Sequence, residues 1–149
     1  FKKNIFEFSE LEELLMHELK HYKGQVLFVR GVVEKEQTVT RKEQVKIVNF
    51  METEDLQKAL CASDLIICRS GYTTVMDLYK LKKKAFFIPT PGQTEQEYLA
   101  QILNEKKICY FQKQHEFDFE KGINECQSFF GFKKVNNNLT NWQELFDLF

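Results

Sequence analysis

No stretch of the sequence approaches the roughly 20 consecutive apolar residues of a membrane-spanning helix, and no signal peptide is visible. An excess of charge of either sign is also missing, because 21 basic and 22 acidic residues leave a net charge of −1. The chain contains no C-x-x-C pair, no internal repeat and no low-complexity segment. The sequence therefore gives no indication of a membrane span, and it lacks the basic footprint of a nucleic-acid-binding protein.

The residues that are present suit one globular domain. The chain has 149 residues, of which 43% are hydrophobic, and this is enough for a single domain with its own core. Four cysteines without metal-type spacing are typical of reduced core thiols in a cytoplasmic protein. They are Cys61, Cys68, Cys109 and Cys126. Because the chain begins at Phe1 rather than Met, we expect it to be part of a longer protein.

Short apolar runs alternate with amphipathic stretches along the chain. Strands are predicted at residues 3–8, 25–30, 45–50, 64–68, 85–88 and 108–111. Helices are predicted to follow at 9–23, from Thr53, from Thr73 or Thr74, from Thr94, at 118–130 and at 139–148, with Gly24 as a helix C′ residue. Ser9 with Glu12 and Thr94 with Glu97 have capping-box spacing, and residues 31–44 are polar enough to predict a loop. The alternation predicts an α/β fold: a Rossmann-like, doubly wound, mostly parallel sheet with helices on both faces.

The first of two informative turns follows the predicted strand that ends at Cys68. Gly71 has no Cβ, so the backbone can approach a ligand closely, and the helix that starts there favours an anion such as phosphate. Ser70, Thr73 and Thr74 offer hydroxyls and amides to phosphate oxygens. Asp77 lies one helical turn further on, where its carboxylate could accept hydrogen bonds from ribose hydroxyls. A capped helix in which Asp77 only complements the helix dipole explains the same pattern.

The second turn, residues 90–97, carries several polar side chains on a proline elbow. Gln93, Gln96 and Glu97 suit a hydroxyl-rich ligand such as a sugar, because amides and carboxylates donate or accept in fixed directions. The alternative is an ordinary polar loop in which Glu97 belongs to a capping box. Both turns follow strands of a predicted parallel sheet, and the carboxyl ends of such strands meet at one edge. We therefore expect the two turns to converge on one ligand pocket.

The sequence also contains a literal H-E-x-x-H at residues 17–21, which is a pattern of zinc peptidases. Position 27, where a third histidine would fall, is Leu27. His17 and His21 lie nearly opposite the apolar face of the predicted helix, so they are expected to face solvent. We therefore predict no metal site.

The segments CRSGYTTVMDL and IPTPGQTEQEYLA resemble the C-terminal, donor-binding domain of GT-B glycosyltransferases, in particular the MurG-like enzymes and the family 28 C-terminal domain. The resemblance covers residues 26–100 well and the rest more loosely. It implies that Ser70 and Gly71 lie near the donor diphosphate and that Thr74 faces phosphate or sugar. It also implies that Asp77 holds the ribose hydroxyls in place of a glutamate that is one methylene longer.

The same resemblance extends to the second turn and to residues before the first. Gln96 matches a glutamine that contacts the sugar ring, while Glu97 replaces a second glutamine and could alter which sugar is accepted. Met51 matches a position whose backbone reads uracil. One departure concerns residues 5–9, because the family's domain opens with a strand and a glycine-rich loop, and no glycine is present here.

The resemblance implies the donor-binding half of an enzyme that transfers a hexosyl or N-acetylhexosaminyl group from a UDP-sugar to an acceptor hydroxyl. Residues 1–149 would form this single domain, which needs no cofactor and is inactive alone. The acceptor site, the catalytic residues and any membrane contact are expected in an N-terminal domain, with the protein in the cytoplasm or at the inner face of the membrane. A GT-B sugar-nucleotide epimerase and a non-catalytic α/β binding module remain as alternatives.

Overall fold

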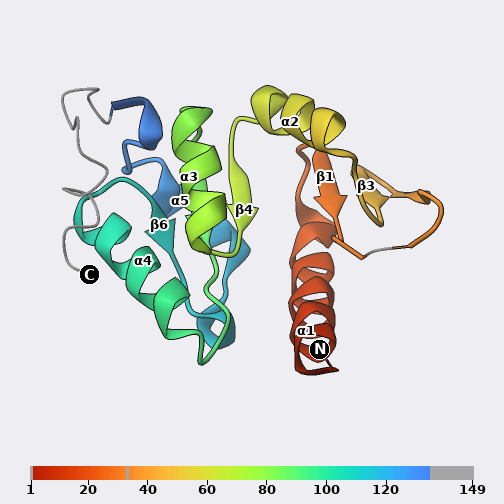
Figure 1. The fold of residues 1–149 in the computed structure, drawn as a ribbon, viewed down its shortest axis with the longest axis horizontal. Helices are drawn as coiled ribbons and strands as arrows, with labels where there is room; N and C mark the ends of the chain where they lie inside the picture. The colour runs from red at the N-terminus through yellow and green to blue at the C-terminus, as the bar shows by residue number, and fades with distance from the viewer. Residues whose placement is uncertain (1, 33, 135–149) are drawn as a thin grey trace. The chain divides into compact units, whose positions relative to one another are not determined.

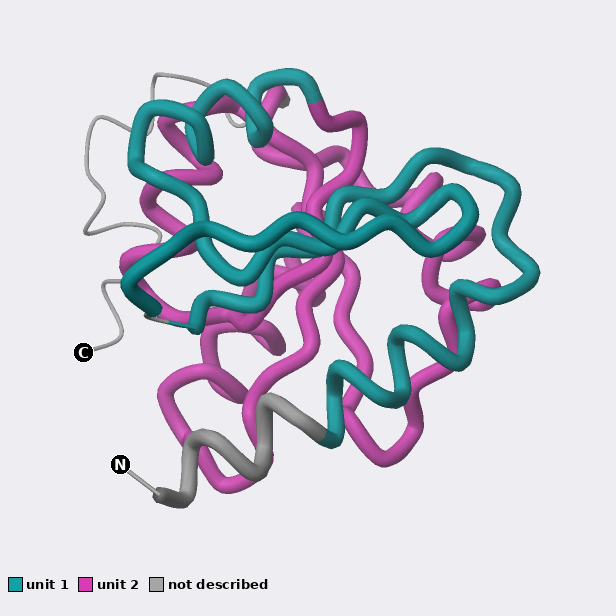
Figure 2. The backbone as a smooth tube through the Cα atoms, turned by 90° about the vertical axis from the view of Figure 1, so that its right-hand side faces the viewer, with its two compact units in different colours: residues 1–62 teal, residues 63–149 magenta. Residues whose placement is uncertain are grey.

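The structure of the protein is a computed structural model that describes residues 2–32 and 34–134. The chain divides into two compact units, residues 1–62 and residues 63–149, which Figure 2 shows in different colours. The predicted helix at 139–148 lies outside the described residues.

The first unit combines a long helix with a three-stranded sheet (Figure 1). Its elements are α1 (Lys2–Glu18), the 3₁₀ turn η1 (Leu19–His21), β1 (Val26–Val29), β2 (Val39–Lys42), β3 (Val45–Val48) and α2 (Thr53–Ala62). The strand order is β1-β3-β2, in which β1 runs parallel and β2 antiparallel to β3. The strands predicted at 25–30 and 45–50 are therefore confirmed.

The strand predicted at residues 3–8 is wrong, because α1 already begins at Lys2. Ile5, Phe8 and Leu15 share a helical spacing with Leu11, and this period of three to four outweighs the short alternation at the start of the chain. The capping box predicted at Ser9 is also wrong, because Ser9 lies inside the helix. The carboxylate of Glu12 instead accepts a hydrogen bond from Arg30 Nε at 2.9 Å.

Two further predictions in this unit are wrong. Gly24 is not a helix C′ residue, because α1 and η1 end before it and its φ is not positive. A Cβ at Gly24 would lie 2.5 Å from Tyr22 Cε1, so close contact with the tyrosine ring explains the glycine. The loop predicted at 31–44 contains β2, whose four residues are all exposed and so show no apolar alternation.

The second unit holds the alternation of strands and helices that the sequence predicts. Its sheet is fully parallel in the order β4-β5-β6. The elements are β4 (Ile66–Cys68), α3 (Tyr72–Lys80), β5 (Ala85–Phe87), α4 (Thr94–Glu105), β6 (Tyr110–Phe111), the 3₁₀ turn η2 (Gln114–Glu116), α5 (Phe119–Cys126) and the 3₁₀ turn η3 (Phe132–Lys134).

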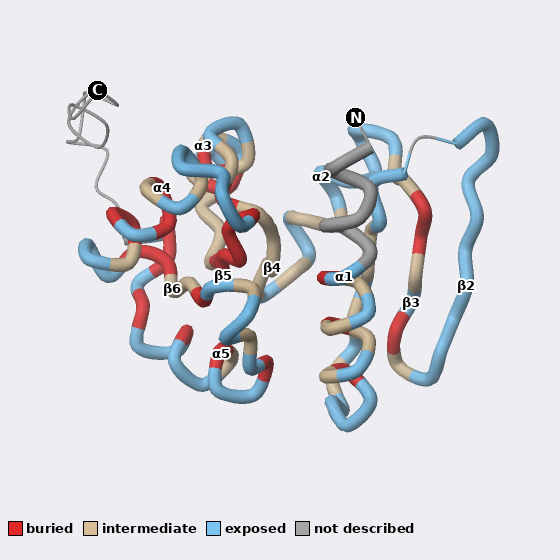
Figure 3. The backbone as a smooth tube through the Cα atoms, turned by 90° about the horizontal axis from the view of Figure 1, so that it is seen from below, coloured by how far each residue is buried: buried red, intermediate tan, exposed pale blue. Residues whose placement is uncertain are grey.

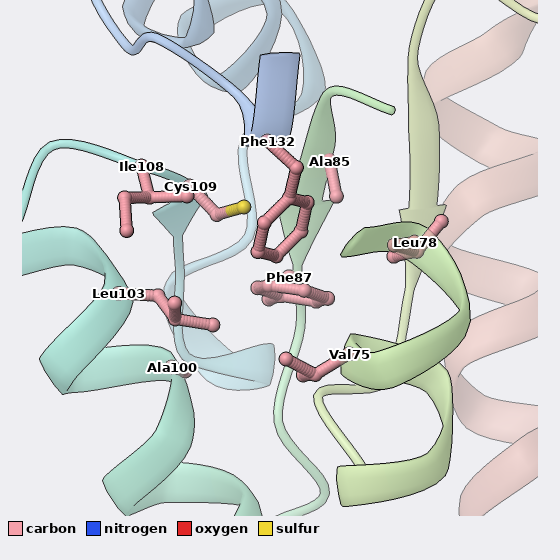
Figure 4. Packing of buried hydrophobic residues seen from close by; sticks show 9 residues of the cluster. All are labelled: Val75, Leu78, Ala85, Phe87, Ala100, Leu103, Ile108, Cys109 and Phe132. Atoms are coloured by element: carbon pink, nitrogen blue, oxygen red, sulfur yellow. The ribbon is translucent and has the colours of Figure 1, made fainter. Parts of the chain in front are cut away.

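Helices cover both faces of this sheet. Consecutive residues of β5 point to opposite sides, so Phe87 and Phe86 each show what covers one face. On one face Phe87 packs in a buried cluster with residues of α3 and α4, among them Val75 and Leu103 (Figure 4). On the other face the Phe86 ring stacks on Phe117 with 5.8 Å between centroids, and Gly122 of α5 lies against it. Figure 3 shows β5 as a buried strand. The predicted doubly wound α/β fold is thus confirmed in this unit.

The four cysteines form no disulfide. Cys109 and Cys126 are buried and Cys68 is half-buried, but Cys61 is exposed, so its predicted core position is wrong. Burial raises the pKa of Cys68 and of Cys126 to about 12, and it raises the pKa of Cys109 still further. The thiolate is the reactive form, so the three inner cysteines are protected chemically as well as sterically.

We expect iodoacetamide at pH 8 to alkylate only Cys61 in the native protein. A thiol whose pKa is about 12 is ionised in roughly one molecule in 10⁴ at this pH. Peptide mass spectrometry would locate the label, and the same reaction in 6 M urea should label all four cysteines. Native labelling of Cys68, Cys109 or Cys126 at the rate of Cys61 would contradict this arrangement.

Candidate functional site

Two turns lie at the carboxyl edge of the β4-β5-β6 sheet. One joins β4 to α3 and the other joins β5 to α4, and in a parallel sheet both follow the same ends of their strands. Gly71 is the N-cap residue of α3 and Gln93 is the N-cap residue of α4. The starts of both helices lie within two residues of the predicted ones.

Ser70 joins the two turns directly. Its side chain is fully buried, and its hydroxyl donates a hydrogen bond of 2.7 Å to the backbone carbonyl of Gln96 in the first turn of α4. The two turns therefore meet, while the ligand pocket predicted at this place stays a prediction. Because the whole of Ser70 is buried and its hydroxyl already bonds within the protein, Ser70 joins the two turns and exposes no group to a ligand.

The side chains of Gln96 and Glu97 both bond back to the second turn. Gln96 Oε1 accepts a hydrogen bond from the Thr90 amide at 2.9 Å, so its Nε2 is the end of the amide that can serve a ligand. Glu97 Oε1 accepts from the Gly92 amide at 3.2 Å. The predicted capping box of Thr94 and Glu97 is wrong, since Thr94 is already the first helical residue.

Gly71 needs no special backbone conformation and relieves no contact within the protein. Its φ of −67° and ψ of 148° suit any residue, and a Cβ at this position would meet no atom within 4 Å. The first helical hydrogen bond of α3 runs from the Val75 amide to the Gly71 carbonyl. The amides of residues 72–74 precede that bond, so the turn presents a helix start beside open space.

The other predicted residues of the second unit are accessible. Thr73 and Asp77 are exposed on one face of α3, four residues apart, and Thr74 is half-buried. Gln93 is exposed and Gln96 is half-buried, so neither is sealed in the core. The remaining predicted residue, Met51, is half-buried and lies in the first unit, so its contact with a base stays a prediction.

Arg69 is the residue of this edge that sequence reasoning missed. Its Nη1 donates to the carbonyls of Ile88 at 2.9 Å and of Pro89 at 3.0 Å. Its Nη2 donates to Gln114 Oε1 at 2.8 Å, in the turn that follows β6. The sequence feature that could have indicated this role is a single arginine between an apolar strand and the serine-glycine turn.

In the part of the chain that the structure describes, the H-E-x-x-H pattern does not belong to a cluster of metal ligands. His17 and His21 are exposed, as predicted, and α1 ends between them at Glu18. Within residues 2–32 and 34–134, no three His, Cys, Asp or Glu side chains gather as metal ligands do. No helix in the same residues is both long and apolar enough to cross a membrane.

Comparison with known sequences gives a consistent family. The chain matches the glycosyltransferase family 28 C-terminal domain over residues 8–140. The relatives are named UDP-N-acetylglucosamine--N-acetylmuramyl-(pentapeptide) pyrophosphoryl-undecaprenol N-acetylglucosamine transferase. The one from Histophilus somni is 38% identical over 80 residues, which cover 53% of this chain and 22% of that protein. The one from Caldanaerobacter subterraneus subsp. tengcongensis is 29% identical over 123 residues, which cover 76% of this chain and 33% of that protein.

A third relative of the same name, from Flavobacterium psychrophilum, is 36% identical over 81 residues, or 53% of this chain and 22% of that protein. The chain thus matches about a third or less of the length of these relatives. No solved structure matches. The family match spans most of the chain, and the second unit has the parallel α/β architecture with two joined turns at its carboxyl edge. The chain therefore belongs to glycosyltransferase family 28, as a C-terminal domain of that family.

Proposed function

We propose that this chain binds the nucleotide-sugar donor of a glycosyltransferase, and that the donor is a UDP-sugar with N-acetylglucosamine as the first candidate. The observation that carries the proposal is the hydrogen bond from Ser70 to Gln96, which brings the helix start at Gly71 and the polar second turn together. The names of the relatives specify UDP-N-acetylglucosamine, and this supports the choice of donor.

The arrangement supports binding by charge and by hydrogen-bond direction. The start of α3 would favour the negative diphosphate, because its first amides and its dipole point outward. Asp77, exposed on α3, would accept hydrogen bonds from the ribose hydroxyls. Gln96 would donate from Nε2 to a sugar oxygen, since its Oε1 already accepts from Thr90. In this scheme the domain contributes donor orientation and charge stabilisation.

The remaining parts of the reaction would come from elsewhere in the protein. We propose that an N-terminal domain supplies the acceptor site and the base, so that an acceptor hydroxyl attacks the anomeric carbon. The full-length enzyme would act in the cytoplasm or at the inner face of the membrane, with membrane contact made by that domain. This chain alone would bind donor and transfer nothing.

Saturation-transfer NMR on the 149-residue chain tests the proposal. We expect signals from the ribose, uracil and sugar protons of UDP-N-acetylglucosamine, and weaker ones from UDP alone. ADP-glucose serves as the comparison ligand and should give less signal. If no nucleotide gives a signal, the proposed function is wrong, and a non-catalytic binding module becomes the better description.

Two variants of Gly71 test whether an anion lies beside it. Asn and Asp are comparably good N-cap residues and nearly the same shape, and a side chain here meets no protein atom within 4 Å. Thermal unfolding of both variants should therefore match or exceed that of the unmodified chain. Gly71→Asn should weaken UDP-sugar binding by about tenfold through steric contact, and Gly71→Asp should weaken it further through charge repulsion.

Calorimetric titration with UDP-N-acetylglucosamine would measure these affinities. The additional loss in Gly71→Asp should shrink at 1 M salt, because screening weakens repulsion between partly exposed charges. Equal affinities for Gly71→Asp and Gly71→Asn at low salt would show that no phosphate approaches this turn.

A further inference from the structure

The second turn is held in place by a side chain from the first. We propose that Arg69 is a positioning residue: it fixes Ile88 and Pro89, which lead into the second turn, and through them the direction in which Gln96 presents its amide to the donor sugar. This inference rests on the proposed function for its ligand. Its structural basis is independent of any ligand.

Arg69 donates hydrogen bonds to the backbone at the point where the pairing of β4 and β5 ends. The last backbone hydrogen bond between these strands runs from the Ile88 amide to the Cys68 carbonyl at 2.9 Å. Amides alternate in direction along a strand, so the next amide that faces β4 is that of Thr90, and it donates to Gln96 Oε1 instead of to β4. The guanidinium of Arg69 donates to the carbonyls of both Ile88 and Pro89. A planar group with several donors in fixed directions is suited to this task.

The position of Pro89 determines the orientation of the Gln96 amide. Thr90 follows Pro89 directly, and its amide donates to Gln96 Oε1 at 2.9 Å. A shift of the turn would move this donor and allow the Gln96 side chain to rotate. Ser70 does not prevent such a rotation, because it bonds to the backbone carbonyl of Gln96 and not to its side chain. Arg69 therefore acts on the sugar contact through Pro89 and Thr90.

A third contact sets the plane of the guanidinium. Arg69 Nη2 donates to Gln114 Oε1 at 2.8 Å, and Gln114 opens the η2 turn after β6. Gln114 is only half-buried, so it can be changed with less risk to folding than Arg69. Glutamate at this position keeps an oxygen for Nη2, whereas leucine has a similar size and no acceptor. These two substitutions form a matched pair.

The experiment compares Gln114→Leu, Gln114→Glu and Arg69→Lys with the unmodified 149-residue chain. The first readout is hydrogen exchange at the Thr90 amide, measured by NMR. It should become about tenfold faster in Gln114→Leu, which removes one acceptor, and in Arg69→Lys, because the three N–H groups of lysine share one nitrogen and cannot reach acceptors that two guanidinium nitrogens serve. Gln114→Glu should leave this rate within about twofold of the unmodified chain, since its carboxylate still accepts from Arg69.

The second readout separates positioning from general weakening of the fold. It is the ratio of the dissociation constants for UDP and for UDP-N-acetylglucosamine. The gain in affinity that the sugar provides should fall several-fold in Gln114→Leu and Arg69→Lys and persist in Gln114→Glu. Affinity for UDP alone should stay within about twofold, because the contacts of Gly71 and Asp77 do not depend on the second turn.

Each outcome decides one question. An unchanged Thr90 exchange rate in both Gln114→Leu and Arg69→Lys would overturn the positioning role. An equal loss of affinity for UDP and UDP-N-acetylglucosamine, with their ratio intact, would also overturn it and leave Arg69 a purely structural residue. If the unmodified chain binds neither ligand, the proposed function fails, and the Thr90 exchange rates alone test whether Arg69 positions the turn.

Discussion

Replacing Asp77 with alanine should weaken UDP-sugar binding by about 10- to 100-fold. Hydrogen bonds to a charged group are worth about 1.5–3 kcal/mol each, and 1.4 kcal/mol corresponds to a factor of ten in affinity. Asp77 is exposed on α3, so the free energy of unfolding should change by less than about 0.5 kcal/mol. Calorimetric titration with UDP-N-acetylglucosamine and urea unfolding measure the two quantities.

The direction of this change is informative by itself. Asp77 is an anion and the proposed ligand is an anion, so long-range charge alone predicts tighter binding when Asp77 is removed. Weaker binding therefore requires a direct contact, such as the ribose hydroxyls bonding to the carboxylate. Asp77→Asn keeps the shape and one acceptor oxygen, and it should fall between alanine and the unmodified chain.

Asp64 provides a matched control for Asp77. It is also exposed, but it precedes β4 and lies toward the amino end of that strand, away from the two turns. Asp64→Ala should leave UDP-sugar affinity within about twofold, since it lies outside the proposed site. The assignment of Asp77 would be wrong if Asp77→Ala bound donor as well as Asp64→Ala does.

The sequence was most informative where strands are buried on both sides. Phe86 and Phe87 point to opposite faces of β5, and both are fully buried. Such a strand appears in the sequence as an uninterrupted apolar run, and the following proline and glycine mark where it ends. The order of strands, turns and helices in residues 63–134 could be predicted for this reason.

Side-chain partners across the two turns could not be predicted in this way. Ser70 bonds to a carbonyl 26 positions away, and Arg69 bonds to Gln114, 45 positions away. Periodicity and capping rules describe only near neighbours, so they placed both residues at the right edge and left their contacts open. These rules also placed Glu97 in a capping box with Thr94, whereas its carboxylate accepts a hydrogen bond from the Gly92 amide.

Local patterns failed elsewhere for two reasons. In one place a longer pattern outweighed a short one, and in another the strand had no apolar pattern at all. Residues 3–8 alternate like a strand, but they continue the helical spacing of the leucines that follow, and the longer period prevails in α1. The strand β2 has no buried residue and so no hydrophobic signal. Its position follows from pairing with β3, which is a tertiary contact.

Gly122→Ala should destabilise the second unit by about 1–3 kcal/mol, although helix propensity alone predicts the opposite sign. Gly122 lies inside α5, where alanine normally stabilises a helix by about 1 kcal/mol relative to glycine. A Cβ here would lie 2.2 Å from Phe86 Cε1 and 2.5 Å from Cζ. The Phe86 ring cannot move away easily, because it is fully buried and in contact with Phe117 and Tyr110.

Urea unfolding of matched variants separates packing from propensity. Asn124→Ala changes an exposed position of the same helix and should be neutral or slightly stabilising. A Gly122→Ala protein as stable as Asn124→Ala would show that the ring yields and that α5 is not packed this closely. Phe86→Leu removes the atoms that clash, so the double variant Gly122→Ala/Phe86→Leu should lose less stability than the two single changes added together. That non-additivity would identify the contact between α5 and β5 as the cause, since propensity effects at separate positions add.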